Sequence, residues 1–219
     1  MNSPDSSPSP PTADLTPVLA ALREYDLRTI ESTLNTYAVV LPPRALIMNV
    51  VLPLLRQIGD EWEAGQLRPA QEHVVSGFVR DVLGALLRVS TPHLAGRRMV
   101  FATPSGEHHE LGLLSAALLA ATRGAEVFYL GPDLPPTEIW QLAMQVRAEV
   151  IVISLTMMQA MSEEMLHDLA EPPRGVEIWL GGPAAESVLA RAGVPGRYLD
   201  TLDTLDALVA ARTKTRPTG

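Results

Sequence analysis

A histidine and a carboxylate that could act together on a metal ion lie in residues 104–112, Pro-Ser-Gly-Glu-His-His-Glu-Leu-Gly. A neutral imidazole is a common metal ligand, and a metal-bound histidine commonly donates its other ring N–H to a carboxylate. Glu107 and His109 supply such a pair, and Gly112 follows them. A single histidine after a strand is more often an ordinary loop residue than a ligand. His109 is therefore a candidate ligand, with His108 as its competitor, and its assignment depends on the residues that accompany it.

Two further groups of small and hydroxylated residues follow along the chain, Ser154 with Thr156 and then the pair Gly181-Gly182. Taken alone, a Gly-Gly pair is usually only a turn, and Ser-x-Thr carries no meaning. Each group nevertheless directly follows a predicted strand, as residues 104–112 do. The carboxyl ends of parallel strands meet at one edge of a sheet, where ligands bind. We expect all three groups to gather there, with the glycines letting the backbone approach a bulky ligand.

The elements that must position these groups are short strands alternating with helices over residues 97–212. This alternation predicts βαβ units and a parallel sheet covered on both faces. Thr137 is expected to cap the second helix. The predicted strands are 98–103, 126–130, 150–154, 177–180 and 198–199, and the predicted helices are 110–122, 137–147, 162–169, 184–191 and 205–211. We therefore predict a flavodoxin-like (Rossmann-like) α/β domain with five parallel strands.

Residues 14–91 have helical periodicity and no strand pattern, which predicts an all-α domain. The first helix is expected to begin at Thr16-Pro17, with the threonine as cap and the proline in the first helical position. The others are predicted at 27–40, at 45–63 with a kink at Pro53, and from 69 to near 90. Short connections favour an antiparallel four-helix bundle. Residues 1–13 are predicted to be a disordered leader, 91–97 a linker and 213–219 a tail.

Trp62 is followed after nine residues by Glu72-His73. The tryptophan lies near the end of the third predicted helix, and the other two residues lie in the first turn of the fourth. The loop between these helices brings an aromatic plane, a carboxylate and an imidazole to one end of a hairpin. The competing interpretation is a buried tryptophan with a glutamate that caps a positive helix end.

Composition limits the classes of function. The chain of 219 residues has 25 acidic and 17 basic residues and a net charge of −8, which disfavours binding of nucleic acid. It has no cysteine, which excludes disulfides, thiolate metal sites and cysteine nucleophiles. No apolar run is long enough to span a membrane, and the N-terminus does not resemble a secretory signal. We therefore expect a cytoplasmic protein that contacts neither DNA nor a membrane directly.

In chain order, the three groups resemble the signature of cobalamin-binding domains, in which the first residue is usually Asp. The residues that carry the resemblance are Glu107-x-His109-x-x-Gly112, Ser154-x-Thr156 and Gly181-Gly182. The resemblance implies that His109 is the lower axial ligand of cobalt, a metal that suits imidazole nitrogen, and that Glu107 accepts its other ring N–H. It also implies that the serine, the threonine and the glycines surround the nucleotide tail of the cofactor.

Together with Trp62 and Glu72-His73, the chain resembles, over about residues 15–210, the light-sensing module of CarH-type photoreceptor regulators. This implies that Trp62, Glu72 and His73 form the upper pocket of adenosylcobalamin. Trp62 would pack against the adenosyl group and Glu72 would accept from ribose hydroxyls. The sequence departs from the family twice: the helix-turn-helix DNA-binding domain is missing, and Glu63 replaces the histidine that takes the upper cobalt position after photolysis. The output and the photoproduct are therefore left open.

The resemblance favours a sensor, with adenosylcobalamin bound in the dark, cobalt–carbon cleavage in light, and a signal to a partner protein. The alternatives are a corrinoid carrier for a methyltransferase system, with methylcobalamin, and a storage or delivery protein, with hydroxocobalamin as another candidate form. A carrier must expose its cobalt to partner enzymes, whereas Trp62 and its neighbours suit a larger upper group. No residues resemble a nucleophile or an acid–base pair for a separate substrate, so turnover by the chain alone is not expected. The oligomeric state is left open.

Overall fold

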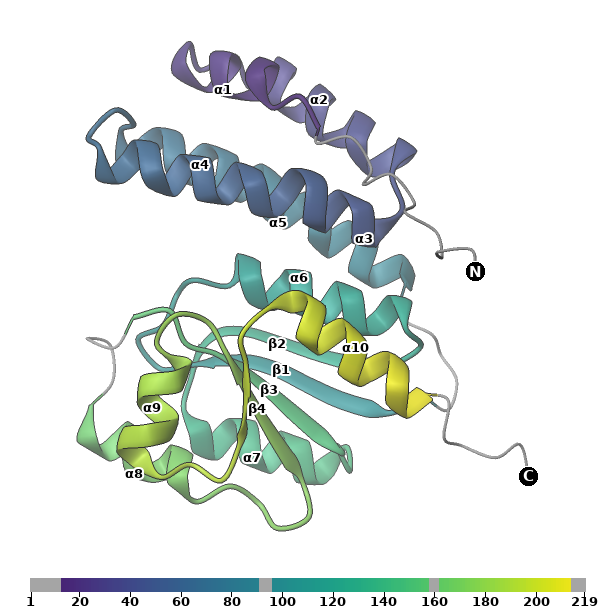
Figure 1. Cartoon of the computed structure of the whole chain (residues 1–219), viewed down its shortest axis with the longest axis vertical. Helices are drawn as coiled ribbons and strands as arrows, with labels where there is room; N and C mark the ends of the chain where they lie inside the picture. The colour runs from purple at the N-terminus through teal and green to yellow at the C-terminus, as the bar shows by residue number, and fades with distance from the viewer. Residues whose placement is uncertain (1–12, 91–95, 158–161, 214–219) are drawn as a thin grey trace, which may run out of the picture. The chain divides into compact units, whose positions relative to one another are not determined.

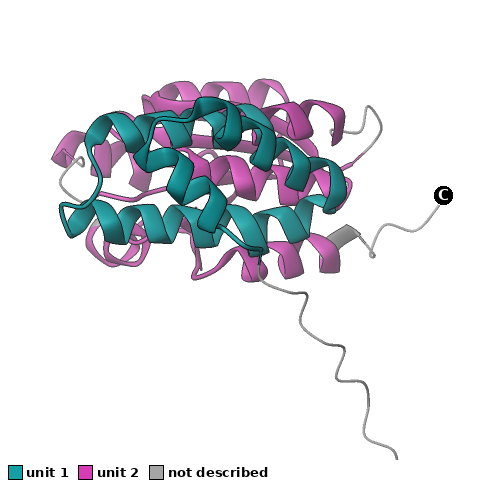
Figure 2. Ribbon diagram, turned by 90° about the horizontal axis from the view of Figure 1, so that it is seen from above, with its two compact units in different colours: residues 1–82 teal, residues 83–219 magenta. Residues whose placement is uncertain are grey.

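The computed structural model describes residues 13–90, 96–157 and 162–213. The chain divides into two compact units, residues 1–82 and 83–219 (Figure 2). The division falls inside the longest helix, α5 (Pro69–Ser90), whereas the sequence places the boundary at the linker after it. Residues 1–12 of the expected leader, 91–95 of the expected linker and 214–219 of the expected tail lie outside the described residues.

The N-terminal unit is helical, as predicted, and its segments are drawn in Figure 1. They are α1 (Thr16–Arg23), α2 (Leu27–Val40), α3 (Pro43–Leu46), a π-helical turn η1 (Ile47–Val51), α4 (Leu52–Glu63) and the first part of α5. Since α3, η1 and α4 follow one another without a break, they form the third of the four predicted helical segments. The core is made of aliphatic side chains at helical spacing, among them Val18, Leu22, Ile30, Val50, Leu54, Val75 and Val79.

The π-helical turn lies at the place where the sequence predicts a kink. Proline has no N–H to donate, so Pro53 leaves a carbonyl of the preceding turn without its helical partner. Just before it, the N–H of Leu52 donates to the carbonyl of Ile47, five residues earlier, which is the π-helical pattern. The irregularity expected at Pro53 is therefore present as a widened turn.

Two predicted helix caps are wrong: at α1 the carboxylate of Asp14 accepts the N–H of Thr16, and at α7 (Pro136–Gln145) no described side chain caps the helix. Thr16 is the first residue of α1, and its N–H donates to Oδ1 of Asp14 at 3.0 Å. Helix α7 begins before Thr137, with Pro136 in its first position. A proline there has no N–H that needs a partner and has its φ angle already set for a helix.

The C-terminal unit contains a five-stranded parallel sheet, which confirms the predicted fold class. The strands are β1 (Arg98–Pro104), β2 (Glu126–Leu134), β3 (Val150–Ser154), β4 (Glu177–Gly181) and β5 (Arg197–Leu199). Their order in the sheet, β2-β1-β3-β4-β5, is the flavodoxin-like order. Strand β3 and most of β1 are buried, as is typical of a parallel sheet covered on both faces.

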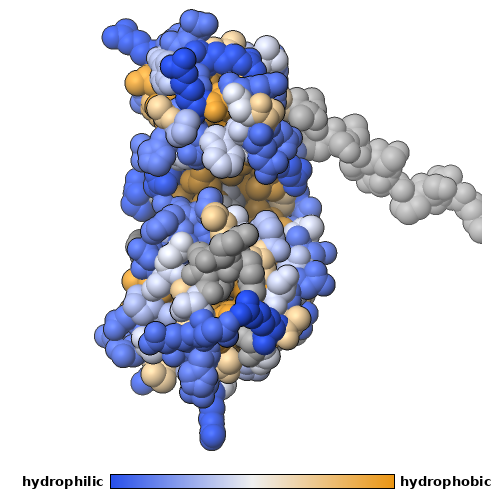
Figure 3. Space-filling view, turned by 90° about the vertical axis from the view of Figure 1, so that its left-hand side faces the viewer, coloured by the Kyte–Doolittle hydropathy of each residue, from blue (hydrophilic) through white to orange (hydrophobic). Residues whose placement is uncertain are grey.

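Helices α6 (Leu111–Thr122) and α10 (Leu202–Thr213) cover one face of this sheet (Figure 1). The other face carries α7, α8 (Glu163–Ala170) and α9 (Ala185–Ala192). On the side shown in Figure 3, hydrophilic side chains cover most of the surface of each unit. Among the described residues no helix is long and apolar enough to cross a membrane.

Strand β2 is longer than the sequence predicts. The expected strand ends at Leu130, but the chain continues along β1, where Gly131 pairs with Ala102 and Leu134 with Pro104. The register shifts between these pairs, and Gly131 and Asp133 have positive φ angles of 88° and 63°. Such irregularities let a strand bend and redirect its side chains. The end of β2 therefore reaches the loop that follows β1.

Candidate functional site

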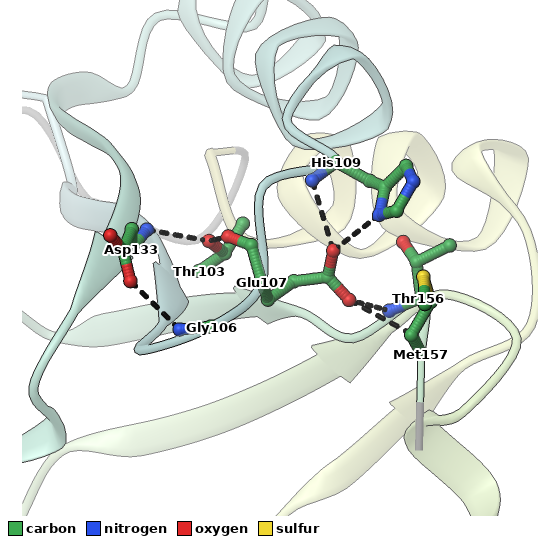
Figure 4. Close-up of polar contacts among 7 residues, drawn as sticks. All are labelled: Thr103, Gly106, Glu107, His109, Asp133, Thr156 and Met157. Carbon is green, nitrogen blue, oxygen red and sulfur yellow. Dashed lines mark hydrogen bonds and ion pairs between the residues drawn. The ribbon is translucent and has the colours of Figure 1, made fainter. Parts of the chain in front are cut away.

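The candidate site lies at the carboxyl ends of β1 and β3. Because β2 and β3 pair with opposite edges of β1, the connections from β1 and β3 leave toward opposite faces of the sheet, and sheets of this kind bind ligands at such a switch point. Glu107 and His109 lie in the loop between β1 and α6, and Thr156 lies two residues after the end of β3. The structure brings these three residues together, as the sequence predicts (Figure 4).

Glu107 connects the two loops. Its side chain is fully buried, and Oε1 accepts a hydrogen bond from the backbone N–H of His109 at 2.9 Å. The same oxygen lies 2.6 Å from Nδ1 of the His109 ring. The other oxygen, Oε2, accepts from the backbone N–H groups of Thr156 at 2.7 Å and Met157 at 2.9 Å (Figure 4). The carboxylate therefore has two donors on each of its oxygens.

These contacts determine the protonation of the pair. Burial raises the pKa of Glu107, but the hydrogen bonds from the backbone of His109 and Met157, the His109 ring and the Thr156 backbone together lower the pKa below its usual value. Glu107 is therefore a carboxylate at neutral pH. Because a carboxylate can only accept, Nδ1 of His109 donates in this contact, and in a neutral imidazole the lone pair then lies on Nε2.

The Nε2 atom of His109 is open to a ligand. The side chain is 57% exposed, and no described residue hydrogen-bonds to Nε2. His108 is exposed as well, but no described carboxylate accepts a hydrogen bond from its ring. The geometry therefore favours His109 over His108 as the residue prepared to bind a metal.

This histidine does not belong to a complete metal cage. Among the described residues, no group of three or more His, Asp or Glu side chains could hold a metal ion. A single imidazole suits a metal that brings its other ligands in a macrocycle, as haem iron does with its proximal histidine. The arrangement around His109 is suited to a tetrapyrrole-like cofactor rather than to a free ion.

The two hydroxylated residues have different surroundings. Ser154 ends β3 and pairs in register with Gly181 of β4. Thr156 contributes its backbone N–H to Glu107, a role that its residue type did not indicate. Both side chains are half-buried, and their predicted contact with a nucleotide tail stays a prediction.

The three signature glycines also differ. Gly182 has a φ angle of +97°, and a Cβ there would lie 2.4 Å from the carbonyl oxygen of Leu155. At Gly181 a Cβ would make only ordinary contacts with Leu199 at 3.7 Å. At Gly112 no described atom outside its own helix lies within 4 Å of the Cβ position. The backbone packing therefore explains Gly182, whereas Gly112 leaves open space beside the site.

The second predicted group is on the N-terminal unit, at one end of the hairpin formed by α4 and α5. Trp62 is 54% exposed, so the interpretation of a buried tryptophan is wrong. Glu72 accepts a hydrogen bond from the hydroxyl of Ser76 at 2.5 Å, and its other oxygen lies 3.5 Å from Nδ1 of His73. The indole face and the His73 ring, whose side chain is 92% exposed, are both available to a ligand.

Two residues that hold the site, Thr103 in β1 and Asp133 in β2, are not predicted from the sequence. Thr103 is fully buried, donates its hydroxyl to the carbonyl of Glu107 and accepts the N–H of Asp133 at 3.0 Å. Asp133 accepts the N–H of Gly106 at 2.7 Å. The available signal was the position of Asp133 between two prolines, since Asp tolerates the left-handed conformation that such turns use.

Comparison with known proteins decides the family. Two models, both described as a B12 binding domain, match residues 15–87 and 97–207. The chain belongs to the B12 binding domain family. This confirms the predicted cofactor, cobalamin.

Among its relatives, this B12 binding chain is 35% identical over 173 residues to the HTH-type transcriptional repressor CarH of Myxococcus xanthus. The match covers 78% of the chain and 58% of that protein. The identity to the HTH-type transcriptional repressor CarA of the same organism is 29% over 182 residues, covering 82% and 62%. The chain thus spans about three fifths of the length of these relatives.

A solved structure shows the same fold. The Methanosarcina barkeri monomethylamine corrinoid protein matches with a TM-score of 0.69 and 15% identity, over 89% of this chain and 96% of that one. At this identity the likeness establishes the architecture alone.

The residues of this B12 binding chain fit its cofactor. A corrin supplies four nitrogen ligands to cobalt and leaves axial positions, so one protein imidazole suffices, which agrees with the single free Nε2 of His109. No described atom outside its own helix lies within 4 Å of a Cβ position at the exposed Gly112, so nothing described obstructs the first turn of α6 there. The ionised Glu107 would make His109 a more basic ligand.

Proposed function

We propose that this B12 binding protein is a light sensor that binds adenosylcobalamin and signals to a partner protein. The observation that carries the proposal is the exposure of Trp62 at the end of α4, together with Glu72 and His73 at the start of α5, the helix that follows it. An aromatic face together with a carboxylate suits a nucleoside, which offers a base for stacking and ribose hydroxyls as donors. The likeness to CarH supports the same assignment.

In this proposal, His109 binds cobalt through Nε2, and Glu107 holds its ring in the required orientation and tautomer. The remaining signature residues surround the nucleotide tail: Gly112, Ser154, Thr156, Gly181 and Gly182. Gly182 has no side chain and acts through its backbone. Trp62, Glu72 and His73 contact the adenosyl group. Adenosylcobalamin supplies a cobalt–carbon bond that light breaks. Trp62 and Glu72 then lose their ligand, and a partner detects the resulting change in the helical unit.

The receiver of the signal is proposed to be a protein. The net charge of −8 does not favour nucleic acid as a direct partner. Both relatives are named as transcriptional repressors, so a regulator of transcription is the class of partner that they suggest.

The test compares the protein with adenosylcobalamin in the dark and after illumination. Free adenosylcobalamin also reacts to light, so the decisive readout is a change in the protein. We expect amide hydrogen exchange in residues 62–76 to speed up after illumination, with an absorption spectrum different from that of the free illuminated cofactor. Equal exchange in dark and light would exclude a sensor. A preference for methylcobalamin, with transfer of its methyl group to a partner enzyme, would establish a carrier instead.

Trp62→Ala is expected to remove the preference for the adenosyl form. Stacking beyond simple area burial contributes about 0.5–1.5 kcal/mol, and loss of the buried ring adds to this, so the ratio of the affinities for adenosylcobalamin and methylcobalamin should fall about tenfold or more. Competition binding of the two cofactors measures this ratio. Trp62→Phe keeps an aromatic face and should retain much of the preference. Val39→Ala, at an apolar position 84% exposed in the same unit, serves as the control. An unchanged ratio in Trp62→Ala would remove this residue from the upper pocket.

A further inference from the structure

The loop that carries Glu107 and His109 is attached to both strands that flank β1. On the β3 side, the backbone N–H groups of Thr156 and Met157 hold Oε2 of Glu107. In what we call the β2 attachment, Thr103 near the end of β1 and Asp133 in β2 hold the backbone of the same loop (Figure 4). The hydrogen bonds on the β3 side hold the carboxylate of Glu107, and those of the β2 attachment hold the backbone around Glu107.

The β2 attachment consists of three linked hydrogen bonds. Asp133 donates its N–H to the hydroxyl oxygen of Thr103, and this hydroxyl donates to the carbonyl of Glu107. The carboxylate of Asp133 accepts the N–H of Gly106, the residue before Glu107. The N–H of Glu107 itself donates to the carbonyl of Pro104 at 3.0 Å. The peptide groups on both sides of Glu107 are therefore held by named partners.

The backbone of Asp133 indicates that its side chain is needed. Its φ angle of +63° is disfavoured for a residue with a Cβ, although Asp tolerates it better than most. Glycine would adopt this conformation without strain but has no carboxylate to offer to Gly106. Strain of this kind persists where the surroundings require it, and at this position it is found beside the candidate ligand.

The length of the Glu107 side chain makes such support important. Glu has one more rotatable bond than Asp and can therefore place its carboxylate in more orientations. Its carboxylate reaches His109 Nδ1 at 2.6 Å in a single orientation only if both ends of the side chain are held. The backbone donors after β3 fix the carboxylate, whereas Thr103 and Asp133 fix the main chain.

We propose that Thr103 and Asp133 are positioning residues for the lower cobalt ligand. They hold Glu107, and through it the imidazole of His109, in the orientation that ligates. This inference rests on the proposed ligation by His109. The two residues then control the fraction of bound cobalamin whose cobalt is ligated by a protein nitrogen.

The test uses pairs of variants that separate hydrogen bonding from shape. Thr103→Val keeps the shape and loses the hydroxyl, whereas Thr103→Ser keeps a hydroxyl. Asp133→Gly removes the strain of the positive φ angle and also removes the acceptor, whereas Asp133→Asn keeps an acceptor oxygen. Asp133 is exposed, so its variants do not disturb the core if Thr103→Val fails to fold. Asp200→Ala is the control, because this exposed carboxylate also accepts a hydrogen bond, from Thr204, but lies after β5.

Two readouts apply to each variant. In the protein without cofactor, amide exchange at residues 106–109 should be about tenfold faster in Thr103→Val and Asp133→Gly. With cobalt(II) cobalamin bound to ¹⁵N-histidine-labelled protein, electron paramagnetic resonance measures the ratio of protein-ligated to unligated cobalt. This ratio should fall about tenfold in the same two variants, as is typical when the partner of a metal ligand is disturbed. Thr103→Ser, Asp133→Asn and Asp200→Ala should retain the wild-type ratio.

An unchanged ratio in Thr103→Val and Asp133→Gly, with or without a lower melting temperature, would show that the two residues only stabilise the fold, and the proposal would fail. The same failure follows if Thr103→Ser and Asp133→Asn do not restore the ratio. The wild type reports separately on the proposed function. If its cobalt carries no labelled nitrogen, ligation by His109 is wrong, and this inference falls with it.

Discussion

His109→Ala is expected to abolish coordination of cobalt by the protein and to weaken cobalamin binding by about 100-fold or more. Changes to the partners of a metal ligand alone cost 10- to 100-fold in affinity, so loss of the ligand should reach or exceed the upper end of that range. The variant also leaves Glu107 as a buried carboxylate without its ring donor. Absorption spectra and equilibrium titration with adenosylcobalamin measure both effects.

Isotope labelling identifies the coordinating atom independently of affinity. In cobalt(II) cobalamin, one axial ¹⁴N splits the paramagnetic resonance lines into triplets and one ¹⁵N splits them into doublets, because their nuclear spins differ. Protein labelled with ¹⁵N-histidine should give doublets, whereas the benzimidazole of the cofactor would give triplets. His108→Ala is the matched control, since it removes an exposed imidazole from the adjacent position. Doublets that persist in His109→Ala and vanish in His108→Ala would transfer the assignment to His108.

Gly182→Ala is expected to destabilise the C-terminal unit by about 3 kcal/mol or more. A residue with a Cβ at a positive φ angle costs on the order of 1–3 kcal/mol. At Gly182 the new Cβ would also lie 2.4 Å from the Leu155 carbonyl oxygen, so backbone must move. For a domain of this size each kcal/mol lowers the melting temperature by roughly 2–4 °C, which predicts a decrease of roughly 6–12 °C. Thermal unfolding monitored by circular dichroism, without cofactor, measures it.

Unlike Gly182→Ala, Gly112→Ala is expected to leave the stability of the protein unchanged or slightly higher. No described atom outside the helix would meet its Cβ, and Ala is the better helix former by about 1 kcal/mol. The protein without cofactor should be as stable as the wild type or slightly more so, whereas its affinity for cobalamin should fall if the cofactor occupies this open space. If Gly182→Ala unfolds at the wild-type temperature, the packing argument at Leu155 is wrong. If Gly112→Ala binds cobalamin normally, that residue does not face the cofactor.

Several features of the fold could be predicted because they depend on local patterns. Apolar periodicity and turn residues located the strands and helices to within a few residues, apart from the extension of β2. The cap predictions failed at Thr16, whose N–H is accepted by Asp14, and at Thr137, because the helix already begins at Pro136. The residue at which a helix begins is decided by small free-energy differences that residue type alone does not resolve.

The sequence by itself determined the pair of Glu107 and His109, because the two residues lie two positions apart in one loop. The grouping of Trp62 with Glu72 and His73 stays a prediction. Only the tertiary structure decided what holds Glu107. The donors Thr156 and Met157 are 49 and 50 residues away, and Asp133 is 30 residues from Thr103. These contacts are made by backbone groups or short side chains, and residue type alone does not show which of them pair across the chain. They meet because β1 lies between β2 and β3, and strand order is a property of the packed sheet rather than of any local segment.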